Sequence, residues 1–314
     1  MTPIEWLMQG DPAIRWQVMR DLTGADDASV TAERARVATE GLGAQLLALQ
    51  AANGLWGGAE WKHNTWDSTM HALWMLRDLG IDPADPRVQH AVALVRENVT
   101  WRMPPEIAGN PFFAGETEPC INGQVASIGA YFRQDVSGII ERLLGEQLAD
   151  GGWNCEAEFG SKRSSFNTTI CVLEALLECE HANGADPRIT AARHRGEKYL
   201  LERRLFRRQS TGEVIEHDRK SRASWLRFAF PTWWHYDVLR ALDYLRAANV
   251  PPDPRLEEPI ALVESSCGDD GRWPLGQRYP GAMLVELDAG EGQPSRWITL
   301  RAMRTLRWYR GDTP

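Results

Sequence analysis

Polar side chains that could do chemistry gather at the starts of the most apolar segments of the chain. In the first such start, His63-Asn64-Thr65-Trp66-Asp67-Ser68-Thr69-Met70-His71, Asp67 and His71 stand four residues apart. If the stretch is helical, the two side chains share one face and can hydrogen-bond. A carboxylate that orients an imidazole suits general-base catalysis, and it is equally half of a metal site. The alternative interpretation is a buried pair in which the two side chains only satisfy each other's hydrogen-bonding groups.

Two later starts carry groups of the same kinds. Glu118-Pro119-Cys120-Ile121-Asn122 is one, and Phe230-Pro231-Thr232-Trp233-Trp234-His235-Tyr236-Asp237 is the other. Four residues of these starts are candidates for acid/base catalysis: Asp67, His71, His235 and Asp237.

The same starts also contain the residue types that bind zinc. Carboxylate, thiolate and imidazole are all zinc ligands, so Asp67, Cys120 and His235 would form a zinc site if the fold brought them together. Because the three residues come from separate segments, their spacing gives this site no support. Ordinary packing is the alternative.

Aromatic residues cluster at these starts as well. Their faces can line an apolar pocket and attract a carbocation, although most tryptophans in helical repeats serve packing. The candidate substrate-binding residues are His63, Trp66, Glu118, Asn122, Phe166, Asn167, Trp233, Trp234, Tyr236 and Trp297.

One segment is basic against an acidic background. Its cations are Arg203, Arg204, Arg207, Arg208, Arg219, Lys220, Arg222 and Arg227. Such a segment could hold a diphosphate or another anionic headgroup. A solvated loop after a helix whose C-terminus favours cations is the alternative.

The elements that must position these residues are marked by three glycine-tryptophan turns. They are Gly54-Leu55-Trp56-Gly57-Gly58, Asp150-Gly151-Gly152-Trp153-Asn154 and Asp269-Asp270-Gly271-Arg272-Trp273-Pro274. Glycine permits the positive φ that ends a helix, and tryptophan can fill the gap between neighbouring helices. We therefore expect each turn to join two helices.

Two further patterns predict the helices themselves. Asp-Pro pairs at 11–12, 85–86, 186–187 and 253–254 predict amphipathic helices, because Asp is a good N-cap and Pro a good first helical residue. More apolar segments predict buried helices at 65–79, 119–132, 166–178, 231–245 and 294–308. Alternating β-branched runs are absent apart from a possible short Glu213-Val214-Ile215, so the predicted class is all-α.

Composition limits the partners and the compartment. The net charge of −8 disfavours nucleic acid, because phosphate binding normally leaves a basic footprint. No stretch approaches about 18 consecutive apolar residues and the N-terminus lacks a signal-peptide pattern, so we expect no transmembrane segment and a cytoplasmic location. Five cysteines without a CxxC pair indicate reduced thiols. The oligomeric state stays open.

The three turns resemble the repeats of the terpenoid cyclase (squalene-hopene cyclase) and protein prenyltransferase superfamily, whose signature is Gln-x-x-x-Asp-Gly-x-Trp after a helix. Gln147-Leu148-Ala149-Asp150-Gly151-Gly152-Trp153 is similar with one residue fewer, and Gln50-Ala51-Ala52-Asn53-Gly54-Leu55-Trp56 has Asn for Asp. The third copy lacks the upstream Gln. The resemblance spans residues near 45 to 310 and implies one domain over 1–314, an α/α toroid of about five to six helical hairpins. The N-terminal Ile14–Arg20 echoes Arg296–Arg301, which suits a first and a last element that meet.

The resemblance implies an enzyme that binds an isoprenoid or another largely apolar ligand in a central aromatic cavity. The Asp-x-Asp-Asp motif of the protonating cyclases and the Asp-Asp-x-x-Asp motif of the ionising synthases are both missing. The family's zinc ligands, one Asp, one Cys and one His, cannot be matched residue by residue. We therefore predict acid/base chemistry by Asp67 and His71, with help from His235 or Asp237.

Three alternatives stay open at this stage. The first is a noncatalytic ligand-binding or scaffold toroid, which the missing acidic motifs favour. The second is zinc-dependent prenyl transfer. The third is a glycan-processing barrel, in which paired carboxylates such as Glu118 and Asp237 would face each other across a cleft.

Overall fold

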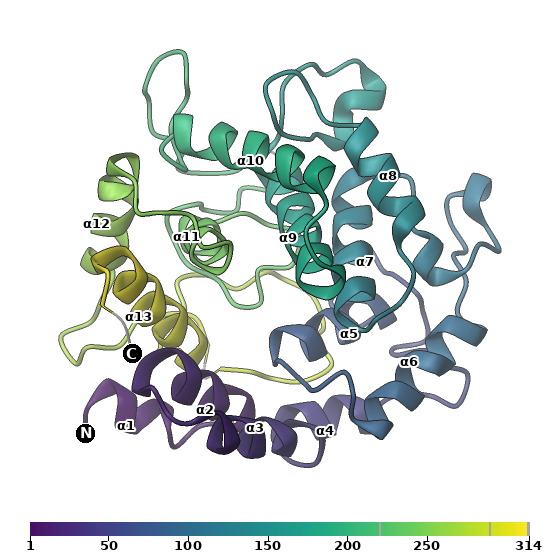
Figure 1. Ribbon diagram of the computed structural model, residues 1–314, viewed down its shortest axis with the longest axis horizontal. Helices are drawn as coiled ribbons and strands as arrows, with labels where there is room; N and C mark the ends of the chain where they lie inside the picture. Colours follow the sequence, from purple (N-terminus) through teal and green to yellow (C-terminus); the bar gives the residue numbers. More distant parts are fainter. Residues whose placement is uncertain (220, 289, 313–314) are drawn as a thin grey trace. The chain divides into compact units, whose positions relative to one another are not determined.

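The computed structural model of the protein describes residues 1–219, 221–288 and 290–312. These residues form helices joined by turns, and the only β contacts among them are isolated bridges (Figure 1). The predicted all-α class is therefore confirmed. In Glu213-Val214-Ile215, where a short strand was possible, Val214 forms a single bridge with Arg207.

The chain divides into two compact units. Unit 1 comprises Met1–Ala44, Leu200–Pro280 and Glu286–Pro314, and unit 2 comprises Gln45–Tyr199 and Gly281–Val285. Two helices, α4 (Gly41–Ala48) and α10 (Pro187–Glu202), belong partly to each unit. The single domain over 1–314 and the closed ring of hairpins stay predictions.

Unit 2 is built around two buried helices that lie side by side, α7 and α9 (Figure 1). Helix α7 also packs against α5 and α8. A Cβ at Gly123 of α7 would lie 2.7 Å from the backbone oxygen of Cys171 in α9, so only glycine permits this close approach. The helices of the unit are α5 (Thr69–Asp78), α6 (Pro86–Asn98), α7 (Pro119–Tyr131), α8 (Ser137–Gly145) and α9 (Phe166–Asn183).

Unit 1 brings the two ends of the chain together. Helix α13 packs against α11 and α12, and it also contacts α1 and α2 from the N-terminus. A first and a last element therefore meet, as the echo between their sequences suggested. The helices of the unit are α1 (Pro3–Leu7), α2 (Pro12–Val18), η1 (Met19–Thr23), α3 (Asp27–Ala35), α11 (Val238–Ala247), α12 (Glu257–Ser265) and α13 (Arg296–Arg310).

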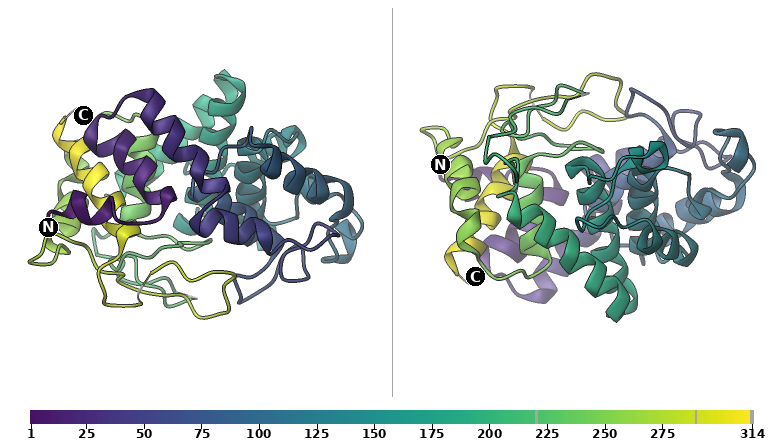
Figure 2. Two further views of the ribbon diagram at one scale, coloured as in Figure 1. Left: turned by 90° about the horizontal axis from the view of Figure 1, so that it is seen from below. Right: turned by 90° about the horizontal axis from the view of Figure 1, so that it is seen from above.

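Short 3₁₀ turns punctuate both units. They are η2 (Arg36–Ala38), η3 (Pro105–Ile107), η4 (Phe112–Ala114), η5 (Cys155–Phe159) and η6 (Pro254–Leu256). Two long connections of unit 1 run together on one side of its helices (Figure 2). One comprises residues 203–219 and 221–237, and the other 266–280, 286–288 and 290–295. They are joined there by hydrogen bonds from the Gln277 amide to the carbonyls of Ser224 and Arg227.

Each predicted Asp-Pro start begins a helix. The carboxylates of Asp11, Asp85, Asp186 and Asp253 each accept a hydrogen bond from the backbone N–H two residues ahead, at 2.8 to 2.9 Å. The first three pairs begin α2, α6 and α10, whereas the fourth begins the short η6 that leads into α12.

The three glycine-tryptophan turns adopt the same structure. In each, the indole N–H donates at 2.7 Å to a carbonyl ten residues earlier, that of Leu46, Leu143 or Val263. The tryptophan backbone N–H donates to a threonine in the following helix, at 3.0 to 3.1 Å. The indoles of Trp56, Trp153 and Trp273 are buried, so the predicted role of these tryptophans as plugs between helices is confirmed.

Two buried helices begin later than predicted. Helix α5 begins at Thr69 instead of Thr65, because the backbone of Trp66 bonds to Ala282. Helix α11 begins at Val238 instead of Pro231, because the buried Arg240 guanidinium binds two backbone carbonyls of the preceding residues. Across the described ranges, none of the helices has both the length and the apolar character needed to span a membrane.

Candidate functional site

A cluster of two thiols and a carboxylate lies in unit 2. One ligand atom each from Glu118, Cys120 and Cys155 lies within 4.8 Å of the other two. Glu118 Oε2 and Cys120 Sγ are 3.6 Å apart. Each of the three residues keeps some exposed surface, although burial acts on the Cys120 thiol itself.

The start of α7 positions two members of the cluster. Glu118 is the N-cap residue, Pro119 is the first helical residue, and Cys120 lies in the first turn. The Asn122 amide oxygen accepts a hydrogen bond from the Glu116 N–H, and the amide nitrogen donates one to the Glu116 carbonyl, at 2.8 Å each. This clamp fixes the path of the chain into the helix and makes Asn122 a positioning residue.

The third member comes from the turn before α9. Cys155 opens η5 two residues after the Trp153 plug. Its Sγ and its backbone N–H both lie 3.4 Å from the hydroxyl of Thr168 in α9. Because Gly123 lets α7 and α9 approach closely, the two cysteine-bearing segments are held beside each other.

The surroundings keep the Cys120 thiol protonated. A hydrogen bond with Cys155, burial and the nearby Glu118 carboxylate together raise the pKa of Cys120 well above its ordinary value. Each of these influences disfavours a bare thiolate. A divalent cation would reverse that balance, because a coordinating thiol is deprotonated by the ion's own charge.

The predicted hydrogen bond between Asp67 and His71 is not formed, and this part of the prediction was wrong. Asp67 precedes the first residue of α5, so the four-residue helical spacing does not apply to it. Its carboxylate binds Lys62 at 2.8 Å and the Thr65 hydroxyl at 2.7 Å. His71 Nδ1 lies instead 2.8 Å from the Ser68 hydroxyl.

His71 is a deeply buried, neutral side chain. Its residue is 2 % exposed, and burial lowers the pKa of its imidazole to about 3. The Trp66 ring meets it edge-on, with 5.4 Å between the ring centroids. His63, by contrast, is exposed and lies beside Trp61.

The second predicted group lies in unit 1, in the connection before α11. His235 is stacked between Trp234 and Tyr279, with ring centroids 3.7 and 3.8 Å away. Burial lowers the pKa of His235 to about 3. Asp237 caps α11, with its carboxylate accepting from the backbone N–H groups of Ala229 and Arg240. Both carboxylate oxygens of Asp237 therefore accept hydrogen bonds from backbone N–H groups. The catalytic role of Asp237 stays a prediction.

The remaining predicted binding residues are mostly packed against neighbours. Phe166 contacts Tyr199 with 5.4 Å between the ring centroids, and Trp297 stacks on Phe230 at 4.4 Å. The Tyr236 hydroxyl donates to the carbonyl of Leu205 at 2.6 Å. Trp233 and Asn167 are buried too.

Around Cys120 the structure gathers Glu118 and Cys155. Asp67 is engaged by Lys62 and Thr65, and the zinc set of Asp67, Cys120 and His235 stays a prediction. Cys155 and Thr168 were not among the site residues predicted from the sequence. The available signal was the place of Cys155 directly after a glycine-tryptophan turn, which puts it at the same kind of helix start as Cys120.

Several cations of the basic segment have partners of their own. Arg207 pairs with Glu258, Arg208 with Glu213 and Arg227 with Glu291, while Lys220 lies outside the described residues. These pairs favour the solvated-loop interpretation of the segment.

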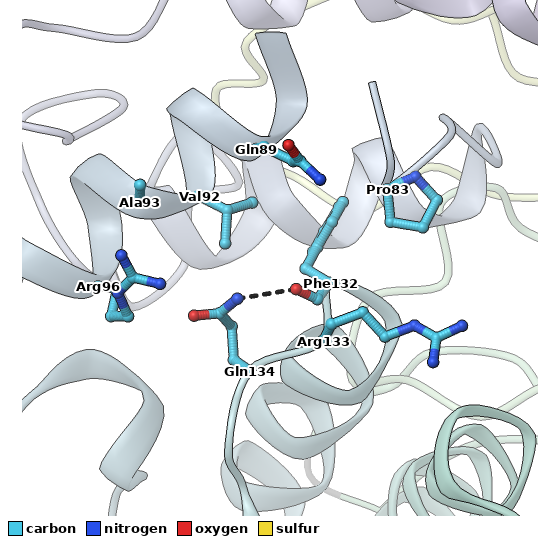
Figure 3. Close-up of a pocket in the computed structure, with 8 residues that line it drawn as sticks. All are labelled: Pro83, Gln89, Val92, Ala93, Arg96, Phe132, Arg133 and Gln134. Carbon is cyan, nitrogen blue, oxygen red and sulfur yellow. Dashed lines mark hydrogen bonds between the residues drawn. The ribbon is translucent and has the colours of Figure 1, made fainter. Parts of the chain in front are cut away.

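Unit 2 also has clefts at the ends of its hairpins. In one of about 350 Å³, Arg96 and Arg133 lie on opposite sides of Gln134, whose amide donates to the carbonyl of Phe132 at 2.8 Å (Figure 3). A cleft of about 650 Å³ follows between the next two hairpin ends, where Arg188 pairs with Glu141. Neither cleft is lined by a residue of the predicted site. Because such clefts recur between successive hairpins, stacking alone accounts for them.

Comparison with known proteins gives no functional assignment for the site. No family model and no curated protein matches the chain. Among solved structures, it is similar to a protein from Actinoplanes, with a TM-score of 0.46 and 16 % sequence identity over 95 % of this chain and 90 % of that chain. A likeness at this level assigns no function.

Proposed function

We propose that the protein is a zinc-dependent transferase that joins a largely apolar, prenyl-type group to the thiol of an acceptor. The observation that carries this proposal is the cluster of Glu118, Cys120 and Cys155. Its site is the start of α7 and the turn before α9. The prenyl-type group is what the superfamily resemblance implies, and it is part of the proposal.

The donor set and its spacing fit zinc. With bonds of about 2.3 Å to sulfur and about 2.1 Å to oxygen, a tetrahedral ion separates a sulfur and an oxygen ligand by about 3.6 Å. Glu118 Oε2 and Cys120 Sγ are 3.6 Å apart. Two sulfur ligands would be separated by about 3.8 Å, so a small rotation of Cys155 completes the set.

The neighbouring residues support such a site without being ligands. Thr168 can keep its hydrogen bond to Cys155 Sγ, which orients that thiol. Gln124 donates to the sulfur of Cys171 at 3.8 Å and so holds the adjoining part of α9. Phe166, at the start of the same helix, packs against Tyr199 of α10.

The ligand charges indicate the acceptor. Two thiolates and one carboxylate outnumber the two positive charges of zinc, so such a site is a weak acid toward water and suits a soft thiol. When bound, zinc supplies Lewis acidity and keeps a thiol deprotonated at its open position. The chain's own residues would hold the ion through Glu118, Cys120 and Cys155 and orient Cys155 through Thr168.

The acid/base alternative has less support from the geometry. Asp67 is engaged by Lys62, and the imidazoles of His71 and His235 are buried with a lowered pKa. A neutral imidazole is a competent base only where a substrate can reach it.

Metal analysis of the purified protein tests the proposal. We expect one zinc ion per chain, reduced at least about tenfold in Cys120→Ser, Cys155→Ser and Glu118→Gln, because loss of one ligand removes much of the affinity. Cys267→Ser, in unit 1, is the matched control and should keep its zinc. Cobalt substitution should give a thiolate-to-cobalt charge-transfer band that disappears in the two cysteine variants.

Two results would contradict the proposal. The first is a folded protein that takes up neither zinc nor cobalt, which would favour the noncatalytic scaffold. The second is metal uptake that survives all three ligand substitutions, which would place the ion elsewhere.

A further inference from the structure

The two thiols of the cluster are close enough to react with each other. The Sγ atoms of Cys120 and Cys155 lie within 4.8 Å of each other. A disulfide needs a sulfur–sulfur distance of about 2.05 Å and Cβ atoms about 3.5 to 4.5 Å apart. The pair is therefore within a side-chain rotation and a small backbone shift of that geometry.

We propose that Cys120 and Cys155 form a reversible disulfide by exchange with a small disulfide of the glutathione class, and that this modification switches off metal binding at the site. The formation of the disulfide stands on the thiol geometry alone. Its effect on metal binding rests on the proposed function.

The local structure allows the required movement. Cys120 is fixed in the first turn of α7, whereas Cys155 opens the short turn η5. That turn is closed by its own hydrogen bonds, from Ala157 and Gly160 N–H to earlier carbonyls and from the Asn154 amide to Arg163. The contact between the Cys155 backbone N–H and the Thr168 hydroxyl is long, at 3.4 Å, so a small shift of η5 toward α7 disturbs a weak hydrogen bond.

The other cysteines of the chain are placed differently. Cys171 is buried in α9 with the Gln124 amide on its sulfur, and Cys179 is buried farther along the same helix. Cys267 lies in unit 1. Cys120 and Cys155 are thus the pair whose sulfurs the structure places within 4.8 Å, and mapping the five thiols can check which pair reacts.

The exchange needs no further reactant. One protein thiolate attacks a sulfur of the small disulfide, and one small thiol leaves with the electron pair and is protonated. The second protein thiolate then attacks the protein sulfur of this mixed disulfide, and the second small thiol leaves. Two protein thiols are oxidised, one small disulfide is reduced to two thiols, and an excess of small thiol reverses both steps.

The test begins with metal-free protein incubated with oxidised glutathione at mildly alkaline pH, then alkylated and mapped by mass spectrometry without reduction. We expect a linked pair of peptides that contain Cys120 and Cys155, with the other three of the five thiols alkylated after denaturation. Dithiothreitol should restore both thiols. Stable glutathione adducts without the link, or a link to Cys171, would overturn the inference.

Two variants make the assignment specific. Cys171→Ser should form the disulfide as the wild type does, whereas Cys120→Ser should stop at a glutathione adduct on Cys155. Because Cys155 is partly exposed, Cys155→Ala serves as a second block whose folding can be verified by circular dichroism. A link that persists in Cys120→Ser or Cys155→Ala would show that another pair reacts.

A parallel reaction with zinc-loaded protein separates the two proposals. Because bound thiolates are unavailable for attack, we expect zinc to slow the exchange at least about tenfold. Equal rates with and without zinc would refute the metal site while the disulfide stands. Failure of the metal-free protein to form the link would refute the disulfide while leaving the metal site to its own test.

Discussion

At the scale of single residues, burial decides what the titratable groups can do. His71 and His235 are buried, and desolvation lowers the pKa of each to about 3. Cys120 and Cys155 keep some exposed surface, and their sulfurs lie within 4.8 Å of each other. The two cysteine residues thus keep some contact with solvent, whereas the two imidazoles serve mainly as packed, neutral side chains.

The two buried histidines predict an acid-sensitive fold. An unfolded histidine binds a proton below a pH of about 6.5, whereas these two stay neutral in the folded protein down to a pH of about 3. Their stabilising contribution is therefore complete above pH 6.5 and is lost progressively as the pH falls toward 3. Each histidine should remove about 1.4 kcal/mol of unfolding free energy per pH unit across that window.

Urea unfolding measured at several pH values tests this expectation. The variants His71→Gln and His235→Gln should each show a shallower loss of stability with acid than the wild type. His63→Gln, at an exposed position, is the matched control and should leave the slope unchanged. A slope that is the same in all four proteins would show that other groups cause the acid sensitivity.

At the scale of elements, the glycine-tryptophan turns are the repeated joints of the fold. Each tryptophan ties the preceding helix to the following one through its indole N–H and its backbone N–H. In the second turn, the two hydrogen bonds of Trp153 fix the path of the chain after this residue, and so they fix the position of Cys155. The turn thereby links a structural repeat to the candidate site.

The same substitution, threonine to valine, made separately at each of the three glycine-tryptophan turns tests whether the turns are equivalent. Thr69→Val, Thr169→Val and Thr299→Val each keep the side-chain shape but remove the hydroxyl that accepts the tryptophan backbone N–H. Because the N–H stays buried without that acceptor, each change should cost about 1–3 kcal/mol of unfolding free energy.

Chemical denaturation of the three variants measures these costs side by side. Thr211→Val, at an exposed turn, is the control and should change stability by less than about 0.5 kcal/mol. A negligible cost at one of the three joints would show that its hydrogen bond is dispensable and that the copies are not equivalent.

At the scale of the whole molecule, unit 1 depends on segments from both ends of the chain. Asp243 of α11 accepts hydrogen bonds from Arg246, Arg301 and Arg304, and Arg304 also binds Gln17 and Asp21 near the N-terminus. Burial raises the pKa of Asp243, but the three arginine charges outweigh it and hold that pKa far below its ordinary value. This buried network joins helices that are far apart in sequence.

Removal of the central charge should therefore destabilise unit 1. Asp243→Asn leaves three largely shielded guanidinium groups without their buried carboxylate, and breaking a buried pair costs about 3–5 kcal/mol. Asp253→Asn is the matched control: it keeps a good N-cap and removes only a partly exposed pair with Arg255, so it should cost less than about 1 kcal/mol. Thermal unfolding followed by circular dichroism compares the two, and equal small effects would show that the network is not a stabilising centre.

Local rules explain how much the sequence determined by itself. The Asp-Pro starts, the glycine-tryptophan turns and the all-α class depend on backbone sterics, capping and hydrophobic period, which act within a few residues. Accordingly, α2, α6 and α10 begin where the sequence placed them, and Trp56, Trp153 and Trp273 plug the gaps expected of them.

Contacts between distant segments decided the rest. The pairing of Asp67 with His71 fails because Trp66 bonds to Ala282, more than two hundred residues away, and delays the start of α5. The approach of Cys155 to Cys120 depends on the packing of α7 against α9 at Gly123. Spacing along the chain carries no information about such approaches, because they follow from which helix faces meet. The sequence therefore determined the elements and the residue types at their ends, and only the tertiary structure decided which of those residues share a site.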